Sequence, residues 1–244
     1  EEPLEIRVAG EPLAITMRTP GEDRFLAVGF LFAEGVISSL ADVGTVAHCG
    51  RPDEEGFDNV IDVAPGPGVA LDPSRLDRSR RRTLTTASCG VCGRRSIDDL
   101  LERIGPTDRT IAVAREAITA APAALARMQH AFATTGGVHA AAALRDDGSL
   151  VAHAEDVGRH NAVDKVVGKL LYEERLAQAA ILVVSGRVSF EIVQKAAAAH
   201  IPIIAAISAP TSLAVDLALR ARITLAAFVR EGSANLYTHA ERVR

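Results

Sequence analysis

The sequence lacks tryptophan, has only three cysteines, and contains few aromatic residues, which make up 4% of its 244 positions. A small, odd number of cysteines does not fit a disulfide framework and suits a reducing compartment. A chain of this length can bury a sufficient core without disulfides. Because apolar residues reach 48% while aromatics are scarce, we expect that core to be mostly aliphatic.

Long apolar runs are also missing. No stretch of 18 or more apolar residues occurs, so no segment is expected to span a membrane. The apolar region of a signal peptide is not seen either, and we therefore expect a soluble, cytoplasmic protein. An excess of positive charge is absent too, since the net charge is −4, which argues against a long nucleic acid as a partner.

The first part of the chain predicts a small mixed unit. Turn residues and two acids at positions 19–23 are typical of a helix start, and Gly35 lies where that helix should end. Short apolar runs on both sides of this helix predict strands. They lie at residues 4–8, 12–18, 43–48 and 59–63. Residues 1–70 are therefore predicted to form a β-β-α-β-β unit.

The remainder divides at about residue 131. Residues 71–130 are predicted to be a linker with helices, one through Ile97 and Ile104 and one from Pro122 to near Phe132. In residues 131–244, after an initial hairpin, strands alternate with helices, which predicts a three-layer α/β sheet. The predicted strands are 138–144, 150–155, 181–185, 201–207 and, as the last one, 224–230. The fold class is thus α/β, preceded by the small α+β unit.

The most specific local motif is Ser88-Cys89-Gly90-Val91-Cys92-Gly93. Two thiols at this spacing can bind one metal, exchange a disulfide or relay a persulfide, and the flanking glycines leave the backbone free to present sulfur. An arginine-rich stretch upstream and a helix start downstream both favour thiolate, which is the reactive form. A single Cys-x-x-Cys excludes a four-cysteine zinc ribbon. A site completed by a distant histidine stays open, as does the interpretation of both cysteines as small buried residues.

A second cluster combines two blocks at the ends of predicted elements, where α/β sheets place ligand sites. Gly136 and Gly137 allow a close approach of backbone N–H groups to a phosphate or base. The second block, at the start of a helix, offers both capping and anion-binding groups. Its members are Asp156, Arg159, His160 and Asn161, with His139 at the end of the first block. A capped helix with a solvated charge cluster is the plainer interpretation.

Two strand–turn–helix segments add weaker signals. They are Ser185-Gly186-Arg187-Val188-Ser189 and Ser208-Ala209-Pro210-Thr211-Ser212. Each resembles an anion site at a helix N-terminus, but neither is a P-loop, because the glycine-lysine pattern is missing. The last predicted strand ends in an aromatic residue and an arginine, and Phe228 or Arg230 could stack on a base.

The order of these motifs across almost the whole chain resembles one family, the formate dehydrogenase accessory proteins, or FdhD-type sulfur carriers. The resemblance rests on six blocks. They are Arg18-Thr19-Pro20-Gly21 with 29–35, the Cys-x-x-Cys block 88–93, the glycine block 135–141, the acidic and basic block 155–165, Ser185-Gly186-Arg187, and 208–212. The family's fold is similar to that of cytidine deaminases in the second half.

The resemblance implies a function as well. Such proteins accept sulfur from a cysteine desulfurase as a persulfide and pass it to the bis-molybdopterin guanine dinucleotide cofactor of formate dehydrogenase. By similarity, Cys89 carries the persulfide and Cys92 assists its transfer, in the manner of a sulfurtransferase. A guanine nucleotide would mimic part of the cofactor, no bound metal is implied, and a homodimer is expected. The implied cofactor contacts are Phe228, Val229, Arg230, Glu231, Gly232 and Ser233, together with Gly136, Gly137, His139, Asp156, Arg159, His160 and Asn161.

Three alternatives compete with this interpretation. A zinc deaminase needs His-x-Glu and Pro-Cys-x-x-Cys, whereas His139 is followed by two alanines and Cys89 follows a serine. A thioredoxin-like enzyme expects its cysteines directly after the first strand of a βαβ unit, not after an arginine-rich linker. A chaperone that binds the cofactor without covalent sulfur transfer is not excluded. The sequence does not identify the client enzyme, the dimer interface or the desulfurase surface, nor does it decide whether Cys92 is essential.

Overall fold

The computed structural model describes residues 1–50, 57–69 and 93–244. Its N-terminal part contains a four-stranded sheet with the strand order β2-β1-β4-β3. The strands β1 and β2, and also β3 and β4, pair antiparallel, whereas β1 and β4 run parallel. Their bounds are β1 Glu2–Val8, β2 Glu11–Arg18, β3 Val43–His48 and β4 Val60–Pro65.

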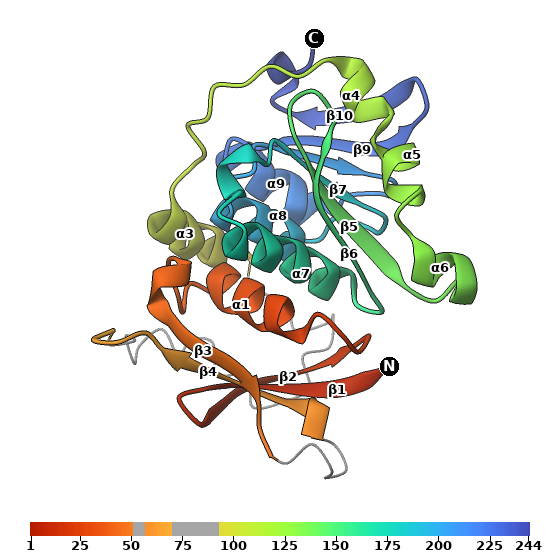
Figure 1. Cartoon of the computed structure of the whole chain (residues 1–244). Coiled ribbons are helices and arrows are strands. Elements are labelled where there is room, and N and C mark those ends of the chain that lie inside the picture. The colour runs from red at the N-terminus through yellow and green to blue at the C-terminus, as the bar shows by residue number, and fades with distance from the viewer. Residues whose placement is uncertain (51–56, 70–92) are drawn as a thin grey trace.

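Helix α1 (Asp23–Ala33) connects this sheet to the rest of the molecule. It lies between the small sheet and α7 (Figure 1) and packs closely on α7 (Arg159–Tyr172). The helix is buried along most of its length, because both of its sides face other elements. Two glycines permit the close crossing: a Cβ on Gly29 would lie 1.9 Å from the Asp164 carbonyl oxygen, and one on Gly168 would lie 2.0 Å from that of Phe25.

The C-terminal part is built on a six-stranded sheet with the order β10-β9-β8-β7-β5-β6. The central strands β7, β8 and β9 are parallel and joined by helices, while β5 runs antiparallel to both β6 and β7. Apolar side chains fill both faces of the central strands, as is usual for parallel sheets. The bounds are β5 His139–Leu144, β6 Leu150–Asp156, β7 Ile181–Val184, β8 Ile203–Ala206, β9 Thr224–Arg230 and β10 Ser233–Thr238.

Helices cover both faces of this sheet. On one face lie α7, α8 (Phe190–Ala198) and α9 (Ser212–Arg220), and one hydrophobic core continues from them through α1 into the small sheet. On the other face, α4 (Arg115–Thr119) and α5 (Ala121–Ala126) close a smaller core. The remaining helices are α3 Gly93–Ile104, which packs on α8 and α9, and α6 His130–Thr135.

The predicted α/β class is confirmed, with strand–helix alternation from β7 to β9 and a β-β-α-β-β order in the N-terminal unit. Two details were wrong. The strand at 224–230 is not the last one, because β10 follows it; β10 has an exposed, largely polar surface, so no alternating apolar pattern marks it. The single helix predicted from Pro122 to near Phe132 is interrupted: α5 ends at Ala126 and α6 begins at His130. The predicted domain boundaries remain predictions.

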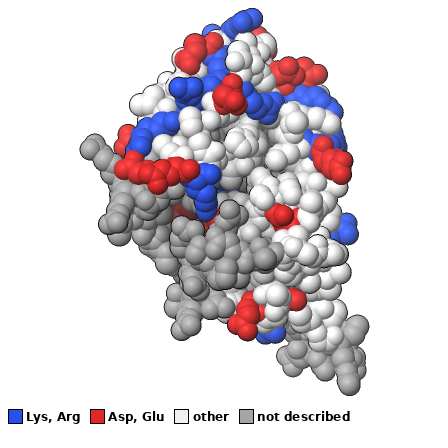
Figure 2. Space-filling view, turned by 90° about the vertical axis from the view of Figure 1, so that its left-hand side faces the viewer, with Lys and Arg blue, Asp and Glu red and all other residues white. Residues whose placement is uncertain are grey.

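The surface mixes both signs of charge. Figure 2, with the α3 side toward the viewer, shows Lys and Arg interspersed with Asp and Glu over the part of that face that the structure describes. Among the described residues, no helix has the length and apolar character needed to cross a bilayer.

Candidate functional site

The site predicted from sequence gathers at the edge where β7 and β8 end. Strand β5 begins at the same edge because it is antiparallel to β7. As a result, Ser185 forms two hydrogen bonds with Ala140 of β5. Its Oγ accepts from the Ala140 nitrogen at 2.9 Å, and its own nitrogen donates to the Ala140 oxygen at 3.0 Å. The His139 Nδ1 lies 3.5 Å from the same hydroxyl.

Gly186 brings two more elements into contact at this point. A Cβ on Gly186 would lie 3.3 Å from Arg159 Cδ and 3.3 Å from His139 Nδ1, so the absence of a side chain lets both residues approach. Burial lowers the pKa of His139, and the charge of Arg159 lowers it further. His139 and Arg159, which come from separate blocks of sequence, therefore meet over one glycine.

Arg159, the first residue of α7, is the strongest candidate for anion binding. Its Nε is buried and has no hydrogen-bond partner. Burial lowers the pKa of its guanidinium, and the neighbouring charge of Arg187 adds to this effect. A buried, unpaired donor on a cation is costly unless a ligand satisfies it. Since helix N-termini also favour anions, this position fits a phosphate group.

His160 faces the next helix. Its Nε2 lies 3.0 Å from the Ser189 hydroxyl and 3.8 Å from Glu191 Oε2. Burial lowers the pKa of His160 to about 4, and the charges of Lys195 and Arg159 act in the same direction. The ring is therefore neutral near pH 7 and can both donate and accept one hydrogen bond. Lys195 forms a buried ion pair with Asp164 one turn deeper, with Nζ 2.7 Å from Asp164 Oδ1.

The segment 228–233 extends the edge beyond β8. Phe228 has a φ of +52°, a left-handed conformation that is unusual for a bulky residue, and the residue is 43% exposed. Its nitrogen donates to the Ser208 oxygen at 3.3 Å, and Arg230 Nη1 donates to the Ile207 oxygen at 2.6 Å. Val229 is fully buried and belongs to the core. The other three predicted positions, Glu231, Gly232 and Ser233, are exposed at the turn into β10.

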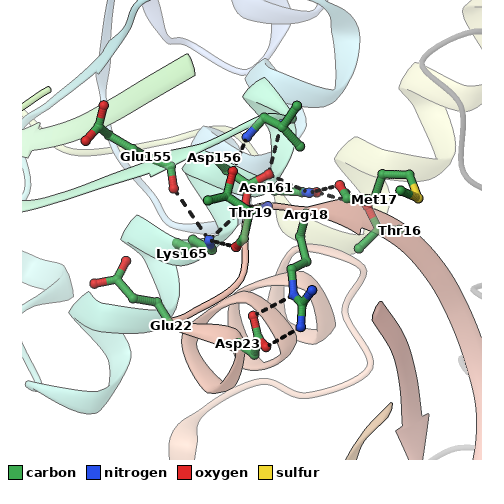
Figure 3. A network of polar contacts seen from close by, with 12 residues as sticks. Thr16, Met17, Arg18, Thr19, Glu22, Asp23, Glu155, Asp156, Asn161 and Lys165 are labelled. Atoms are coloured by element: carbon green, nitrogen blue, oxygen red, sulfur yellow. Dashed lines mark hydrogen bonds and ion pairs between the residues drawn. The ribbon is translucent and has the colours of Figure 1, made fainter. Parts of the chain in front are cut away.

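The glycines of the block 135–141 are exposed, whereas two polar residues of the block 155–165 are buried. Gly136 ends α6 with a φ of +64°, and both it and Gly137 are exposed, with no close neighbours to prevent a ligand from approaching. Asp156 and Asn161, in contrast, are buried and hydrogen-bonded to the chain itself (Figure 3). The structure thus brings His139, Arg159 and His160 to the edge and holds Asp156 and Asn161 behind it.

Sequence reasoning missed two participants on the inner side of the site. Thr19 contacts the turn before α7, and Lys165, which belongs to the block 155–165, is only 1% exposed. A signal was present for Lys165, because Val163, Val166 and Val167 leave little room for a solvated side. No local pattern could have paired Thr19 with a turn more than a hundred residues away.

Cys89 and Cys92 lie outside the described residues, as does the arginine-rich stretch before them. Helix α3 begins at Gly93, the last residue of the motif. This helix is anchored by buried Leu100 and by an ion pair between Asp98 and Arg220 of α9. Cys49 follows β3 and is half-buried. Among the described residues, no group of His, Cys, Asp and Glu is arranged to hold a metal ion.

Comparison with known proteins agrees with this arrangement of motifs. The model of the FdhD/NarQ family matches residues 1–244. This chain belongs to the FdhD/NarQ family. A protein of Anaeromyxobacter dehalogenans named sulfur carrier protein FdhD is 56% identical to it, over 100% of this chain and 87% of that protein. A protein of the same name from Mycobacterium tuberculosis is 50% identical, over 100% of this chain and 90% of that protein.

A solved structure shows a similar fold. The crystal structure of a protein from Desulfotalea psychrophila, described as a formate dehydrogenase accessory protein, superposes with a TM-score of 0.76 at 25% identity. The match covers 99% of this chain and 88% of that one, so the overall fold is shared.

Proposed function

We propose that this FdhD/NarQ-family protein is a sulfur carrier for formate dehydrogenase, working in the cytoplasm. The observation that carries the proposal is the match, over the whole chain, to proteins named sulfur carrier protein FdhD. The chain also has the chemistry that such a role needs, in Cys89 and Cys92. The donor of the sulfur would be a cysteine desulfurase, and the acceptor the bis-molybdopterin guanine dinucleotide cofactor.

The sulfur chemistry needs the two cysteines, the donor's persulfide and, to complete the cycle, a reducing dithiol. The Cys89 thiolate attacks the outer sulfur of the donor's persulfide, which gives a Cys89 persulfide and returns the donor's thiolate. The Cys92 thiolate then attacks the Cys89 sulfur, so that a disulfide forms and hydrosulfide leaves. The leaving sulfur gains two electrons and the two cysteines lose two. A cellular dithiol must reduce the disulfide before the next cycle.

The sheet edge fits the nucleotide part of the proposed acceptor. A pyrophosphate requires cationic donors, and Arg159 offers a buried donor without a partner next to exposed Arg187. Gly186 lets Arg159 and His139 pack closely together at this edge, and exposed Phe228 presents a flat ring for a base. The bound cofactor would supply the molybdenum that receives the sulfur, whereas the residues at the edge bind and orient its nucleotide.

Persulfide carriage is tested by intact-mass spectrometry after incubation with a cysteine desulfurase and cysteine. We expect a gain of one sulfur atom that reductant reverses, and its loss in Cys89→Ala. Cys92→Ala should load normally but release sulfide more slowly. Absence of the adduct on the unaltered protein, with nucleotide binding intact, would refute covalent carriage and favour a cofactor-binding chaperone.

The sheet edge with His139, Arg159, Arg187 and Phe228, called the nucleotide edge below, is tested separately by calorimetry with guanosine diphosphate. Arg159→Met should weaken binding by about 2 kcal/mol, roughly thirtyfold in Kd, because a charge-assisted hydrogen bond is lost. Arg109→Met is the matched control, since Arg109 also is partly buried but donates to the Ala177 and Ala179 carbonyls at the opposite end of β7. Equal Kd values for the unaltered protein, Arg159→Met and Arg109→Met would refute the assignment of this edge as the nucleotide site.

A homodimer is the assembly we expect, and light scattering of the purified protein measures it directly. A monomer at micromolar concentration would contradict this part of the proposal without affecting the sulfur chemistry, which needs only one chain.

A further inference from the structure

The carboxylate of Asp156 stands at the centre of a buried polar network just behind the candidate site. It is fully buried and accepts four hydrogen bonds (Figure 3). Oδ1 accepts from the Gly158 nitrogen at 2.8 Å and from Asn161 Nδ2 at 3.0 Å, while Oδ2 accepts from the Thr19 nitrogen at 3.1 Å and lies 2.7 Å from Lys165 Nζ. A carboxylate has about four lone-pair sites, so none is left for a ligand.

The turn between β2 and α1 holds the same network from the N-terminal unit. Thr19 Oγ1 accepts from the Val157 nitrogen at 2.9 Å, and the Thr19 oxygen accepts from Lys165 Nζ at 3.0 Å. Thr19 thus binds both the turn and the lysine that neutralises Asp156. The two segments are separated by 137 positions in the chain, yet each fixes the backbone of the other.

Asn161 adds a second connection between the N-terminal unit and α7. Its Nδ2 donates to the Met17 oxygen at 2.7 Å as well as to Asp156, and Thr16 donates to its Oδ1 at 3.2 Å. The end of β2 is therefore attached to the first turn of α7. These contacts add hydrogen bonds to the apolar packing between the N-terminal unit and α7, beside the ion pair between Lys169 and Glu22.

The first turn of α7 depends on this network, because it has no side-chain cap of its own. Its N-cap residue is Gly158, which carries no side chain to bind the free N–H groups of the helix. Arg159 and His160 follow Gly158 directly. The direction in which they leave the helix start is consequently set by the bonds that Asp156 makes to Gly158 and Asn161.

We infer that Asp156, supported by Thr19 and Lys165, is a positioning residue that aims Arg159 and His160 at the nucleotide edge, and that it does not contact the ligand itself. This inference rests on the proposed function of the edge. It assigns a role to the β2–α1 turn of the N-terminal unit, which supplies part of the framework of a site located on the other sheet.

The test uses Asp156→Asn and guanosine diphosphate as the probe, with Kd and Tm measured on the full chain. Asparagine keeps the shape but cannot accept from all four donors. We expect Kd to rise at least about tenfold at a temperature where the variant is folded. If Asp156→Asn proves too unstable, Thr19→Val is the milder variant; it removes the Oγ1 that accepts from the Val157 nitrogen and should raise Kd about threefold.

Two further variants separate positioning from stability. Asp23→Asn is the matched control, because Asp23 is also a buried carboxylate paired with a buried cation, Arg18, but it does not touch the turn before α7. It should lower Tm and leave Kd within twofold. The double variant Asp156→Asn with Lys165→Met removes both buried charges, so Tm should recover in part. Kd should stay high, since asparagine has a single acceptor oxygen and cannot bind the Gly158, Asn161 and Thr19 donors together.

The outcomes are distinguishable. If the unaltered protein does not bind guanosine diphosphate, the proposed function of the edge fails. If it binds, and Asp156→Asn binds equally well, the positioning role is wrong. Recovery of Kd together with Tm in the double variant would also overturn it, because the effect would then be one of stability alone.

Discussion

The crossing of α1 and α7 leads to a prediction whose sign is opposite to the usual rule. Gly29 and Gly168 both lie inside helices, where replacement by alanine normally stabilises by about 1 kcal/mol. Here a Cβ on Gly168 would come within 2.0 Å of the Phe25 carbonyl oxygen, and the atoms around it are backbone atoms that no side-chain rotation can move. The two helices would have to separate.

The expected cost follows from this overlap. A contact between carbon and oxygen needs more than 3 Å, so relief requires a shift of about an ångström in a densely packed region, and overpacking of this kind costs about 1–3 kcal/mol or more. We predict that Gly168→Ala is destabilised by about 2 kcal/mol after its gain in helix propensity. For a chain of this size that corresponds to a Tm lower by about 4–8 °C. Gly29→Ala, with its Cβ 1.9 Å from the Asp164 oxygen, should behave in the same way.

Thermal unfolding followed by circular dichroism measures the effect, with Gly137→Ala as the control. Gly137 has only ordinary contacts, the nearest atoms being those of Thr135 at 3.9 Å, so alanine there should leave Tm unchanged or raise it slightly. A Tm for Gly168→Ala equal to or above that of the unaltered protein would refute the close crossing.

Three further predictions concern the edge. The pKa of His160 in the folded state is about 4, below its usual 6.5, so the unfolded state takes up the proton at a higher pH than the folded state does. The free energy of unfolding therefore falls as pH decreases through this window, by about 2 kcal/mol at pH 5. His160→Gln should lack this loss, so its Tm should differ less between pH 8 and pH 5 than that of the unaltered protein. A pH profile identical to that of the unaltered protein would contradict a neutral His160. Glu155 accepts from the Ala131 and Phe132 nitrogens at 2.8 and 2.9 Å, so Glu155→Ala should cost about 1 kcal/mol and speed hydrogen exchange in residues 131–137; unchanged exchange there would exclude this cap. Because Phe228 has a φ of +52°, Phe228→Gly should be more stable than Phe228→Ala by about 1 kcal/mol in chemical denaturation, the reverse of the order usual in strands, and the usual order would argue against the strain.

Local patterns were sufficient for much of the fold. Short apolar runs and alternating apolar residues predicted the strands from β1 to β9, and turn residues marked the start and end of α1. Local patterns did not predict elements whose sequence lacks a regular spacing of apolar residues or clear stop signals. Strand β10 exposes Leu236 and Tyr237 and pairs irregularly with β9, so it reads as a loop in the sequence. The interruption between α5 and α6 lies in an alanine-rich stretch without clear helix stop signals.

The candidate site was predicted in part. Its location at the carboxyl ends of parallel strands follows from strand–helix alternation, and the structure does bring His139 and Arg159 together there. Which residues of the block 155–165 face the edge and which are buried was not predictable. Aspartate, arginine and asparagine have the same polar character in a sequence whether they face a ligand or the interior.

The sequence by itself determined the family, the order of the elements and the two cysteines with their spacing, since these depend on residues close together in the chain. Only the tertiary structure decided which polar side chains are buried and which face the edge. That choice depends on contacts between distant segments, such as the one between Thr19 and Asp156, and the free energy of a buried charge is set by the partners that folding brings to it. Asp156 is saturated by four such partners, whereas Arg159, three positions later, keeps a buried donor without one.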